Sequence, residues 1–216
     1  MTLCLKATGS APGDLSAEQM EFVADLTDRY GFGELRVTHE QNLVLTDVRV
    51  SDLPALYKAL KNEHLATPYT GLLNDMISCP GGDYCSLANA KSIPVAEAIQ
   101  RRFDDYERLK NIGEMTINIS GCMNACGHHH VGNIGILGVD KKGEEFYQVT
   151  LGGAANRYTA LGKVLGPSFA QDEIPDVIEK IIELYLAKRE GNELFIDTVN
   201  RLGIEPFKEH VYAKAD

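Results

Sequence analysis

The sequence of 216 residues lacks long apolar runs, internal repeats and segments of low complexity, and it has fewer basic than acidic residues. Because no run approaches the roughly 20 apolar residues that span a bilayer, we expect no transmembrane helix. Its 21 Lys and Arg residues stand against 31 Asp and Glu residues. The net charge of −10 argues against general nucleic-acid binding, which requires a basic surface. What remains is an ordinary globular composition, in a chain long enough for one domain or two small ones.

The chain also begins without a long apolar segment, since Met1 to Lys6 alternate between apolar and polar residues. A secretory leader requires such a segment, so we expect the protein to remain in the cytoplasm. Thiols stay reduced in that compartment, and the five cysteines are therefore expected as free thiols or metal ligands rather than disulfides.

Four of the five cysteines lie in two segments that are rich in glycine. Cys79 and Cys85 have the spacing C-x5-C, and Cys122 and Cys126 have the spacing C-x3-C. Gly or Pro beside the sulfurs lets the backbone approach closely and direct N–H groups inward. A cluster held by thiolates needs such donors, because hydrogen bonds to its sulfurs help to set its potential. The pattern therefore predicts a metal-cluster site.

Other interpretations of the four cysteines remain open at this point. Structural zinc usually spaces paired cysteines by two to four residues, so the five residues between Cys79 and Cys85 are wide for a zinc site. Disulfides are possible from the number of cysteines, and buried unligated thiols are the simplest alternative. Four thiolates favour a [4Fe–4S] cluster, although spacing alone does not fix the cluster type. Cys4, far from both segments in sequence, is predicted to be a buried apolar residue.

The pattern of apolar residues divides the chain into two parts. Residues 1–66 predict a compact βαββα unit. Its predicted elements are a strand over 3–8, a helix that Ser16 caps and Gly31 ends, strands over 35–38 and 43–50, and a helix that begins at 51–54 and runs through 60.

Residues 67–216 predict a larger, mixed α/β part, so the fold class of the whole chain is predicted to be α+β. Its predicted elements are a short run at 75–78, a helix from Ser92 or Pro94 that includes Tyr106, a strand over 115–119, a hairpin of strands 133–139 and 144–151, and helices over 172–188 and 195–202, the second being the last.

Several segments together resemble the siroheme-containing nitrite and sulfite reductases. The cysteine segments read CPGGDYC and GCMNACG, and the resemblance extends to LRVTHEQNLVLTDV, VGNIGILGV, YQVTLGG and FIDTVNRLGIEPF. These segments cover nearly the whole chain. The resemblance implies a ferredoxin-like half-domain over residues 1–66, followed by a siroheme and [4Fe–4S] cluster-binding domain over residues 67–216.

The resemblance also implies which residues hold the cofactors. It assigns the cluster ligands to Cys79, Cys85, Cys122 and Cys126. In the family, the last of the four cysteines also bridges the cluster to the siroheme iron, which here implies that role for Cys126.

Four further residues are candidates for contact with siroheme or the cluster. Arg36 and Arg157 could hold siroheme carboxylates, because a guanidinium group matches a carboxylate bidentately. Asn124 lies between two ligands and could donate to a cluster sulfur or a carboxylate. His128, the first of three successive histidines, is the candidate for the cofactor environment. The alternatives are solvated surface residues and, for Asn124, a turn.

One departure from the family concerns the number of repeats. These reductases are generally built from two similar halves, whereas this sequence contains one ferredoxin-like segment and one cofactor-binding segment. Where the anion-binding half has Arg in the motif TRQ, this chain has Glu40 in HEQN. The basic residues that grip the anion are therefore expected in another half, and the chain is expected to be incomplete alone.

The resemblance implies an oxidoreductase that carries out the six-electron reduction of sulfite to sulfide or of nitrite to ammonia. Its expected partners are the anion, a ferredoxin or flavoprotein electron donor, and either the other half of the reductase or a second copy of the chain. Two alternatives are a non-catalytic iron–sulfur electron-transfer protein and a compact single-half sulfite reductase that acts as a homo-oligomer.

Overall fold

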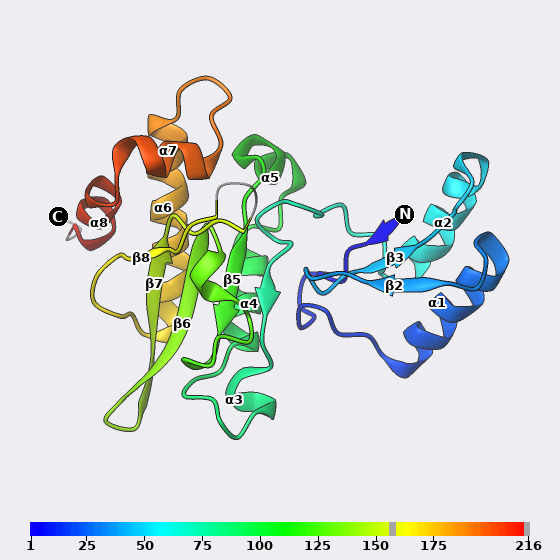
Figure 1. Ribbon diagram of the computed structural model, residues 1–216, viewed down its shortest axis with the longest axis horizontal. Helices are drawn as coiled ribbons and strands as arrows, with labels where there is room; N and C mark the ends of the chain where they lie inside the picture. The colour runs from blue at the N-terminus through cyan, green and yellow to red at the C-terminus, as the bar shows by residue number, and fades with distance from the viewer. Residues whose placement is uncertain (156–158, 214–216) are drawn as a thin grey trace.

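The chain folds into two lobes, each with its own β-sheet and its own apolar core (Figure 1). The structure is a computed structural model that describes residues 1–155 and 159–213. The N-terminal lobe contains a three-stranded sheet, and the larger lobe contains a five-stranded sheet. Mixed helices and strands confirm the predicted α+β class. Within the described ranges, no helix is both long and apolar enough to cross a membrane.

The N-terminal lobe has the predicted βαββα order. Its elements are β1 (Thr2–Leu3), α1 (Ala17–Tyr30), β2 (Leu35–Val37), β3 (Leu43–Leu45), the 3-10 turn η1 (Val50–Asp52) and α2 (Leu53–Asn62). The strands are antiparallel in the order β1-β3-β2. The first and third strands are shorter than predicted. Leu5 N donates to the Asn42 side chain, and Asp47 turns the backbone into the left-handed region, so neither segment continues as a strand.

The sheet of the larger lobe combines parallel and antiparallel pairs. Its strands are β4 (Ile77–Ser78), β5 (Ile117–Ser120), β6 (Ile134–Lys141), β7 (Glu144–Leu151) and β8 (Lys163–Val164), in that order across the sheet. The first three are parallel, and the last two pairs are antiparallel. The predicted hairpin is confirmed with a two-residue turn at Lys142 and Gly143, whose positive φ angles of 60° and 87° suit the tight turns that join twisted strands.

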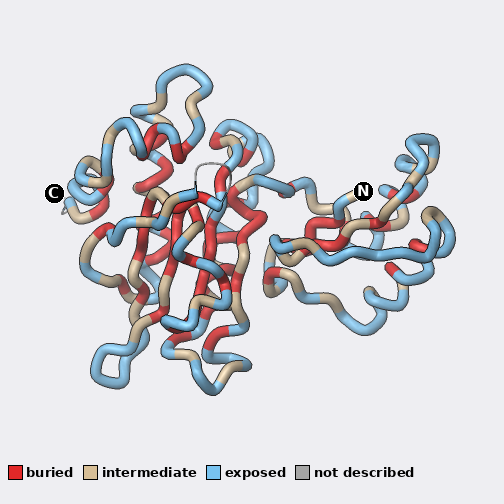
Figure 2. The backbone as a smooth tube through the Cα atoms, in the orientation of Figure 1, coloured by how far each residue is buried: buried red, intermediate tan, exposed pale blue. Residues whose placement is uncertain are grey.

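Helices pack against this sheet, whose strands are largely buried (Figure 2). They are α3 (Gly81–Tyr84), α4 (Ile93–Arg102), α5 (Tyr106–Ile112), α6 (Ile174–Lys188), α7 (Phe195–Leu202) and α8 (Glu205–Tyr212), with 3-10 turns η2 (His129–Val131) and η3 (Gln171–Glu173). Helix α6 contacts α4, α7 and α8 and lies behind the sheet in the view of Figure 1. It is therefore the main apolar support of the larger lobe.

Two predictions about helices in this lobe were wrong. The helix expected to include Tyr106 ends at Arg102, and Tyr106 begins the separate helix α5. The break occurs because Asp105 adopts an extended conformation and its side chain accepts a hydrogen bond from Arg108 N, a typical N-cap. The helix at 195–202 is also not the last, since α8 follows it with Pro206 in its first turn, a position where proline is well tolerated.

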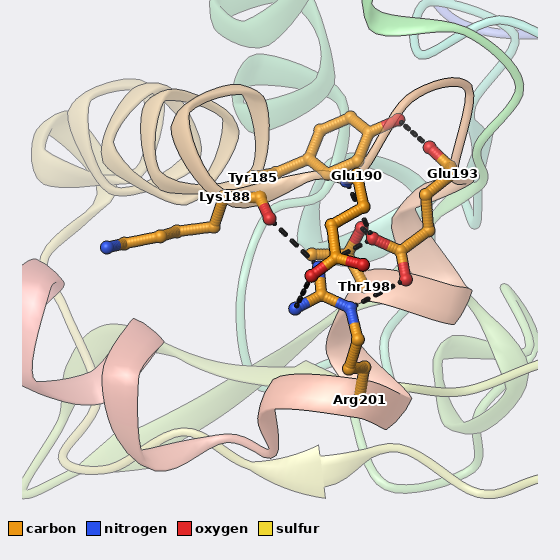
Figure 3. A network of polar contacts seen from close by, with 6 residues as sticks. All are labelled: Tyr185, Lys188, Glu190, Glu193, Thr198 and Arg201. Atoms are coloured by element: carbon orange, nitrogen blue, oxygen red, sulfur yellow. Dashed lines mark hydrogen bonds and ion pairs between the residues drawn. The ribbon is translucent and has the colours of Figure 1, made fainter.

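A polar network fixes the loop between α6 and α7 (Figure 3). The buried hydroxyl of Tyr185 donates to Glu193 O and to Ile112 O, both at 3.0 Å. The Glu193 carboxylate accepts from Thr198 Oγ1 at 2.9 Å and from the Arg201 guanidinium at 2.6 and 2.9 Å. These bonds, led by those from Arg201, lower the pKa of Glu193 to about 2.

This lowered pKa predicts a pH-dependent effect of the substitution Arg201→Gln. Because the folded pKa lies below the usual value of 4.5, the pair stabilises the fold above about pH 4.5 and loses that effect as pH falls toward 2. We expect the substitution to lower Tm at pH 7, with a difference from wild type that narrows below pH 4.5. Thermal unfolding at a series of pH values measures this difference.

Arg36→Gln is the control for that experiment. Its ion pair with Glu34 is solvent-exposed, and such pairs contribute little to stability, so its Tm should stay near that of wild type at every pH. A Tm difference for Arg201→Gln that is the same at pH 7 and pH 3 would contradict the role given to Glu193.

Candidate functional site

Two neighbouring parallel strands bring the cysteine segments together. Strand β4 leads into Cys79, and strand β5 leads into Gly121 and Cys122. Because β4 and β5 pair in parallel, with Ser78 opposite Ile119, their carboxyl ends meet at one edge of the sheet. Cys79 N donates to Ile119 O at 3.1 Å, which continues the pairing to the first cysteine.

Beyond the strands, the two segments are joined by backbone hydrogen bonds. Asn89 N and Ala90 N both donate to Gly121 O, at 2.8 and 3.0 Å, and Gly82 N donates to Ala90 O at 3.0 Å. A side chain at Gly121 would not fit, because its Cβ would lie 2.5 Å from Ala90 O and 2.9 Å from Gly81 Cα. Glycine at position 121 thus allows the close approach that the sequence predicted.

Hydrogen-bond donors surround the sulfur of Cys79. Gly121 N donates to Cys79 Sγ at 3.1 Å, and the hydroxyl of Ser92, a fully buried side chain, lies 3.3 Å from the same sulfur. Ser92 precedes the first residue of α4, so the start of that helix presents its hydroxyl to the cysteine. Sequence analysis placed Ser92 correctly at a helix start but did not identify it as a partner of Cys79.

The four cysteines differ in exposure. Cys122 is buried, Cys79 and Cys85 are half-buried, and Cys126 is exposed. All five cysteines of the chain lie in described ranges and are free thiols, so the disulfide interpretation is wrong for this structure. Within those ranges, no three Cys, His, Asp or Glu side chains are arranged to hold a single metal ion.

Tight turns carry the chain from Cys122 to the histidines. Ala125 N donates to Cys122 O at 3.2 Å, and His128 N donates to Ala125 O at 2.8 Å. Ala125 and His128 both adopt left-handed φ angles, of 58° and 54°. Gly127 N donates to Ser120 Oγ, and Asn118 Nδ2 donates to Gly127 O. These two bonds attach the turn to β5 and position Cys126, which directly precedes Gly127.

A groove of about 510 Å³ lies between the two lobes, where residues 114–116 lead into β5. His39 and Glu40 line it from the N-terminal lobe, while Ile77, Asn118 and His128 line it from the larger lobe. The last three stand within four residues of Cys79, Cys122 and Cys126 in the sequence. The predicted candidate His128 therefore borders the groove, together with His39 and Glu40.

The second and third histidines stack on each other with ring centroids 4.0 Å apart. His129 is buried, and its burial, reinforced by the neighbouring His130, lowers its pKa to about 4. Its Nδ1 has no hydrogen-bond partner within the described parts of the chain. His129 is thus neutral at pH 7, and the three histidines occupy three different environments.

The remaining predicted residues are distributed as follows. Asn124 is exposed between Cys122 and Cys126. Arg36 lies on β2, exposed and paired with Glu34 at 2.7 Å. Arg157 lies outside the described residues. Contact of these side chains with a cofactor stays a prediction. Cys4 is buried as predicted, and burial raises the pKa of its thiol to about 12.

The donor set fits an iron–sulfur cluster. Thiolates are the ligands of such clusters, and here four free thiols occupy two segments that touch each other, with N–H and O–H donors beside one sulfur. The groove between the lobes adds a partly apolar cavity, as an organic cofactor requires.

Comparison with protein families decides the identity of the chain. The family model described as nitrite and sulphite reductase 4Fe-4S domain matches residues 71–216, and the model of the nitrite/sulfite reductase ferredoxin-like half domain matches residues 7–63. The chain belongs to the nitrite and sulphite reductase family. The cofactors of this family are siroheme and a [4Fe–4S] cluster, as predicted.

The relatives in the nitrite and sulphite reductase family include some named as nitrite reductases and others named as sulfite reductases. The chain is 30% identical over 178 residues to the ferredoxin–nitrite reductase of Synechococcus elongatus, covering 79% of this chain and 34% of that protein. It is 30% identical over 203 residues to sulfite reductase [ferredoxin] 2 of Mycolicibacterium paratuberculosis, covering 88% and 36%. The chain therefore spans about a third of the length of the curated relatives it matches.

Solved structures agree with this family. The NirA protein of Mycobacterium tuberculosis superposes with a TM-score of 0.79 at 26% identity, covering 96% of this chain and 39% of NirA. Dissimilatory sulfite reductase I superposes with a TM-score of 0.80, covering 100% of this chain and 69% of that chain. At 15% identity, the second likeness shows the fold alone.

The contact at Gly121 predicts a large effect of the substitution Gly121→Ala. The added methyl group would overlap Ala90 O, so the two cysteine segments must separate, and overpacking of this kind costs about 1–3 kcal/mol. We expect the free energy of unfolding, measured by urea denaturation of the cofactor-free chain, to fall by about that amount.

Gly82→Ala is the matched control in the same segments. Its added Cβ would meet no atom nearer than 3.4 Å, so the urea midpoint should change little. Equal midpoints for Gly121→Ala and Gly82→Ala would show that the two segments do not depend on their close approach.

Proposed function

We propose that this chain is the cluster-bearing half of a siroheme and [4Fe–4S] reductase that reduces nitrite or sulfite. The observation that carries the proposal is the meeting of two thiol segments at the shared edge of β4 and β5, with hydrogen-bond donors beside Cys79 Sγ. The names of the relatives, which include both nitrite and sulfite reductases, support the reaction class and leave both anions as substrates.

The ligands of the cluster in this proposal are Cys79, Cys85, Cys122 and Cys126. The buried Cys122 forms the inner side of the site, and the exposed Cys126 forms its outer side. An exposed sulfur is open to a second metal, so Cys126 is the residue we assign to the siroheme iron. The hydrogen bonds on Cys79 would stabilise the reduced cluster, because donors to a ligand sulfur offset its negative charge.

When bound, siroheme and the cluster would transfer to the anion the six electrons that an external electron donor supplies. The residues of the groove have the separate task of orienting the cofactor and supplying protons. His39, Glu40 and His128 place two imidazoles and a carboxylate at the groove, the types of side chain that donate and accept protons in catalysis. Asn124, Arg36 and Arg157 remain candidates for contact with siroheme, as predicted from sequence.

The proposed site needs residues from a further polypeptide segment. Siroheme carboxylates and an anionic substrate call for Arg or Lys, and the described residues that line the groove include neither. A second half of the reductase, or a second copy of this chain, would supply them. We further propose a domain boundary at residues 66–67, a ferredoxin or flavoprotein as electron donor, and the cytoplasm as the compartment.

Reconstitution with iron and sulfide tests the cluster. We expect about four iron and four sulfide per chain, because four thiolates hold one [4Fe–4S] cluster, and a sharp decrease for Cys85→Ser. Anaerobic metal and sulfide analysis measures both. Cys4→Ser is the control, since Cys4 lies outside both cysteine segments and its thiol contacts Asp75. One zinc per chain in place of iron would overturn the assignment.

Activity measurements test the proposal that this chain alone is incomplete. We expect the reconstituted chain alone to retain siroheme weakly and to reduce neither anion with a strong artificial reductant. Addition of the missing half should restore both properties, because a partner that binds only the folded state stabilises it. Full turnover by a monodisperse monomer would contradict this. Turnover by a dimer would identify the compact homo-oligomer, and a stable cluster that never binds siroheme would identify an electron-transfer protein.

A further inference from the structure

The outer edge of β4 is closed by a side chain rather than by another strand. Strand β4 is the last strand on its side of the sheet, and its pairing with β5 uses the N–H of Cys79. In a parallel ladder, the intervening residue Ser78 then directs its own N–H and C=O away from β5. Ser78 is buried, so these groups need partners other than water.

The side chain of Gln41 supplies both partners. Ser78 N donates to Gln41 Oε1 at 3.0 Å, and Gln41 Nε2 donates to Ser78 O at 2.8 Å. The primary amide thus pairs with Ser78 as a peptide group of a neighbouring strand would. The contact spans the two lobes, because Gln41 belongs to the loop between β2 and β3 and Ser78 to the sheet of the larger lobe.

Buried hydrogen bonds hold the loop that presents Gln41. The fully buried Lys6 donates through Nζ to Glu40 O at 2.8 Å and to Gln41 O at 3.3 Å. The next residue, Asn42, donates through Nδ2 to Asp75 Oδ1 at 2.8 Å. Its Oδ1 accepts from Leu5 N at 3.0 Å. The amide of Gln41 is therefore positioned before it meets Ser78, which reduces the entropy that the contact must overcome.

We propose that Gln41 is a positioning residue for Cys79. Ser78 directly precedes Cys79, and Cys79 Sγ accepts from Gly121 N at 3.1 Å. By holding the backbone of Ser78, the Gln41 amide fixes the sulfur of Cys79 relative to its donors on the neighbouring segment. Through this contact, the N-terminal lobe positions a proposed ligand of the cluster in the larger lobe. The inference rests on the proposed role of Cys79 as a cluster ligand.

The substitution Gln41→Leu removes both hydrogen bonds while keeping a side chain of similar size. It leaves the buried N–H and C=O of Ser78 without partners, which loosens the backbone beside Cys79. Gln41→Glu is a second variant, in which a carboxylate still accepts from Ser78 N but turns a second acceptor toward Ser78 O, which repels it. Both variants should therefore loosen the backbone beside Cys79.

Gln19→Leu is the matched control in the same lobe. Gln19 also makes side-chain hydrogen bonds, to Ser16 N and Glu63 O, but these stay within the N-terminal lobe. Its substitution removes two side-chain hydrogen bonds of the N-terminal lobe and leaves Ser78 and Cys79 untouched. An effect that is common to Gln19→Leu and Gln41→Leu therefore reflects the stability of the lobe and not the position of the cysteine.

The first measurement is amide hydrogen exchange in the cofactor-free chain, followed by NMR. We expect exchange at Ser78 N–H to be about tenfold faster in Gln41→Leu than in wild type, since a net hydrogen bond corresponds to roughly that factor. The control should match wild type. This measurement needs no cluster, so it decides whether Gln41 holds the strand even if the proposed cofactor assignment fails.

The second measurement uses the reconstituted [4Fe–4S] chain. We expect Gln41→Leu to release iron to a chelator several-fold faster than wild type and to shift the midpoint potential of the cluster, with release also faster in Gln41→Glu and unchanged in Gln19→Leu. Release rates and potentials equal to wild type in both Gln41 variants would overturn the proposal. A wild-type chain that assembles no cluster would instead overturn the proposed function, and the exchange rates would then decide the role of Gln41.

Discussion

The parallel pairing of β4 with β5 is the constraint on which the candidate site depends. Two strands that run in the same direction end at the same edge, and each is followed here by a cysteine segment. Cys79 and Cys122 therefore meet although they are far apart in sequence. The close approach also requires a residue without a side chain at position 121, where Ala90 O leaves no room. Topology brings the sulfurs together, and local sterics decide how near they come.

The two lobes are coupled through polar contacts, whereas their apolar side chains, apart from Cys4, form separate cores. Lys6 and Asp75 are both buried at this junction. Burial lowers the pKa of Lys6, and the nearby Asp75 acts in the opposite direction. Buried charges are tolerated only when paired and hydrogen-bonded, so this junction has a specific geometry. Apolar contacts have no preferred direction and would allow several relative positions of the lobes. Directional hydrogen bonds define one arrangement of the groove between them.

Sequence reasoning succeeded where the signal was local. Ser16 forms the capping box that its position before a helix predicts, and the hairpin after residue 133 turns where two residues can adopt positive φ. It failed at Tyr106, because helical spacing continued across a break set by the side chain of Asp105. It also could not find the contact of Gln41 with Ser78, since periodicity carries no information about side chains that meet across two lobes. The cysteine segments were found because their spacing is itself the signal.

The contacts of Lys6 have a consequence for how freely this protein can change. Lys6 binds the carbonyl oxygens of Glu40 and Gln41, and every amino acid has such an oxygen. The path of the loop is therefore largely independent of which side chains stand at positions 39 and 40, although both positions face the groove. Evolution or an engineer can exchange those two side chains while the backbone stays in place. The loop thus presents two exchangeable side chains to the groove on a backbone that the buried lysine holds in place.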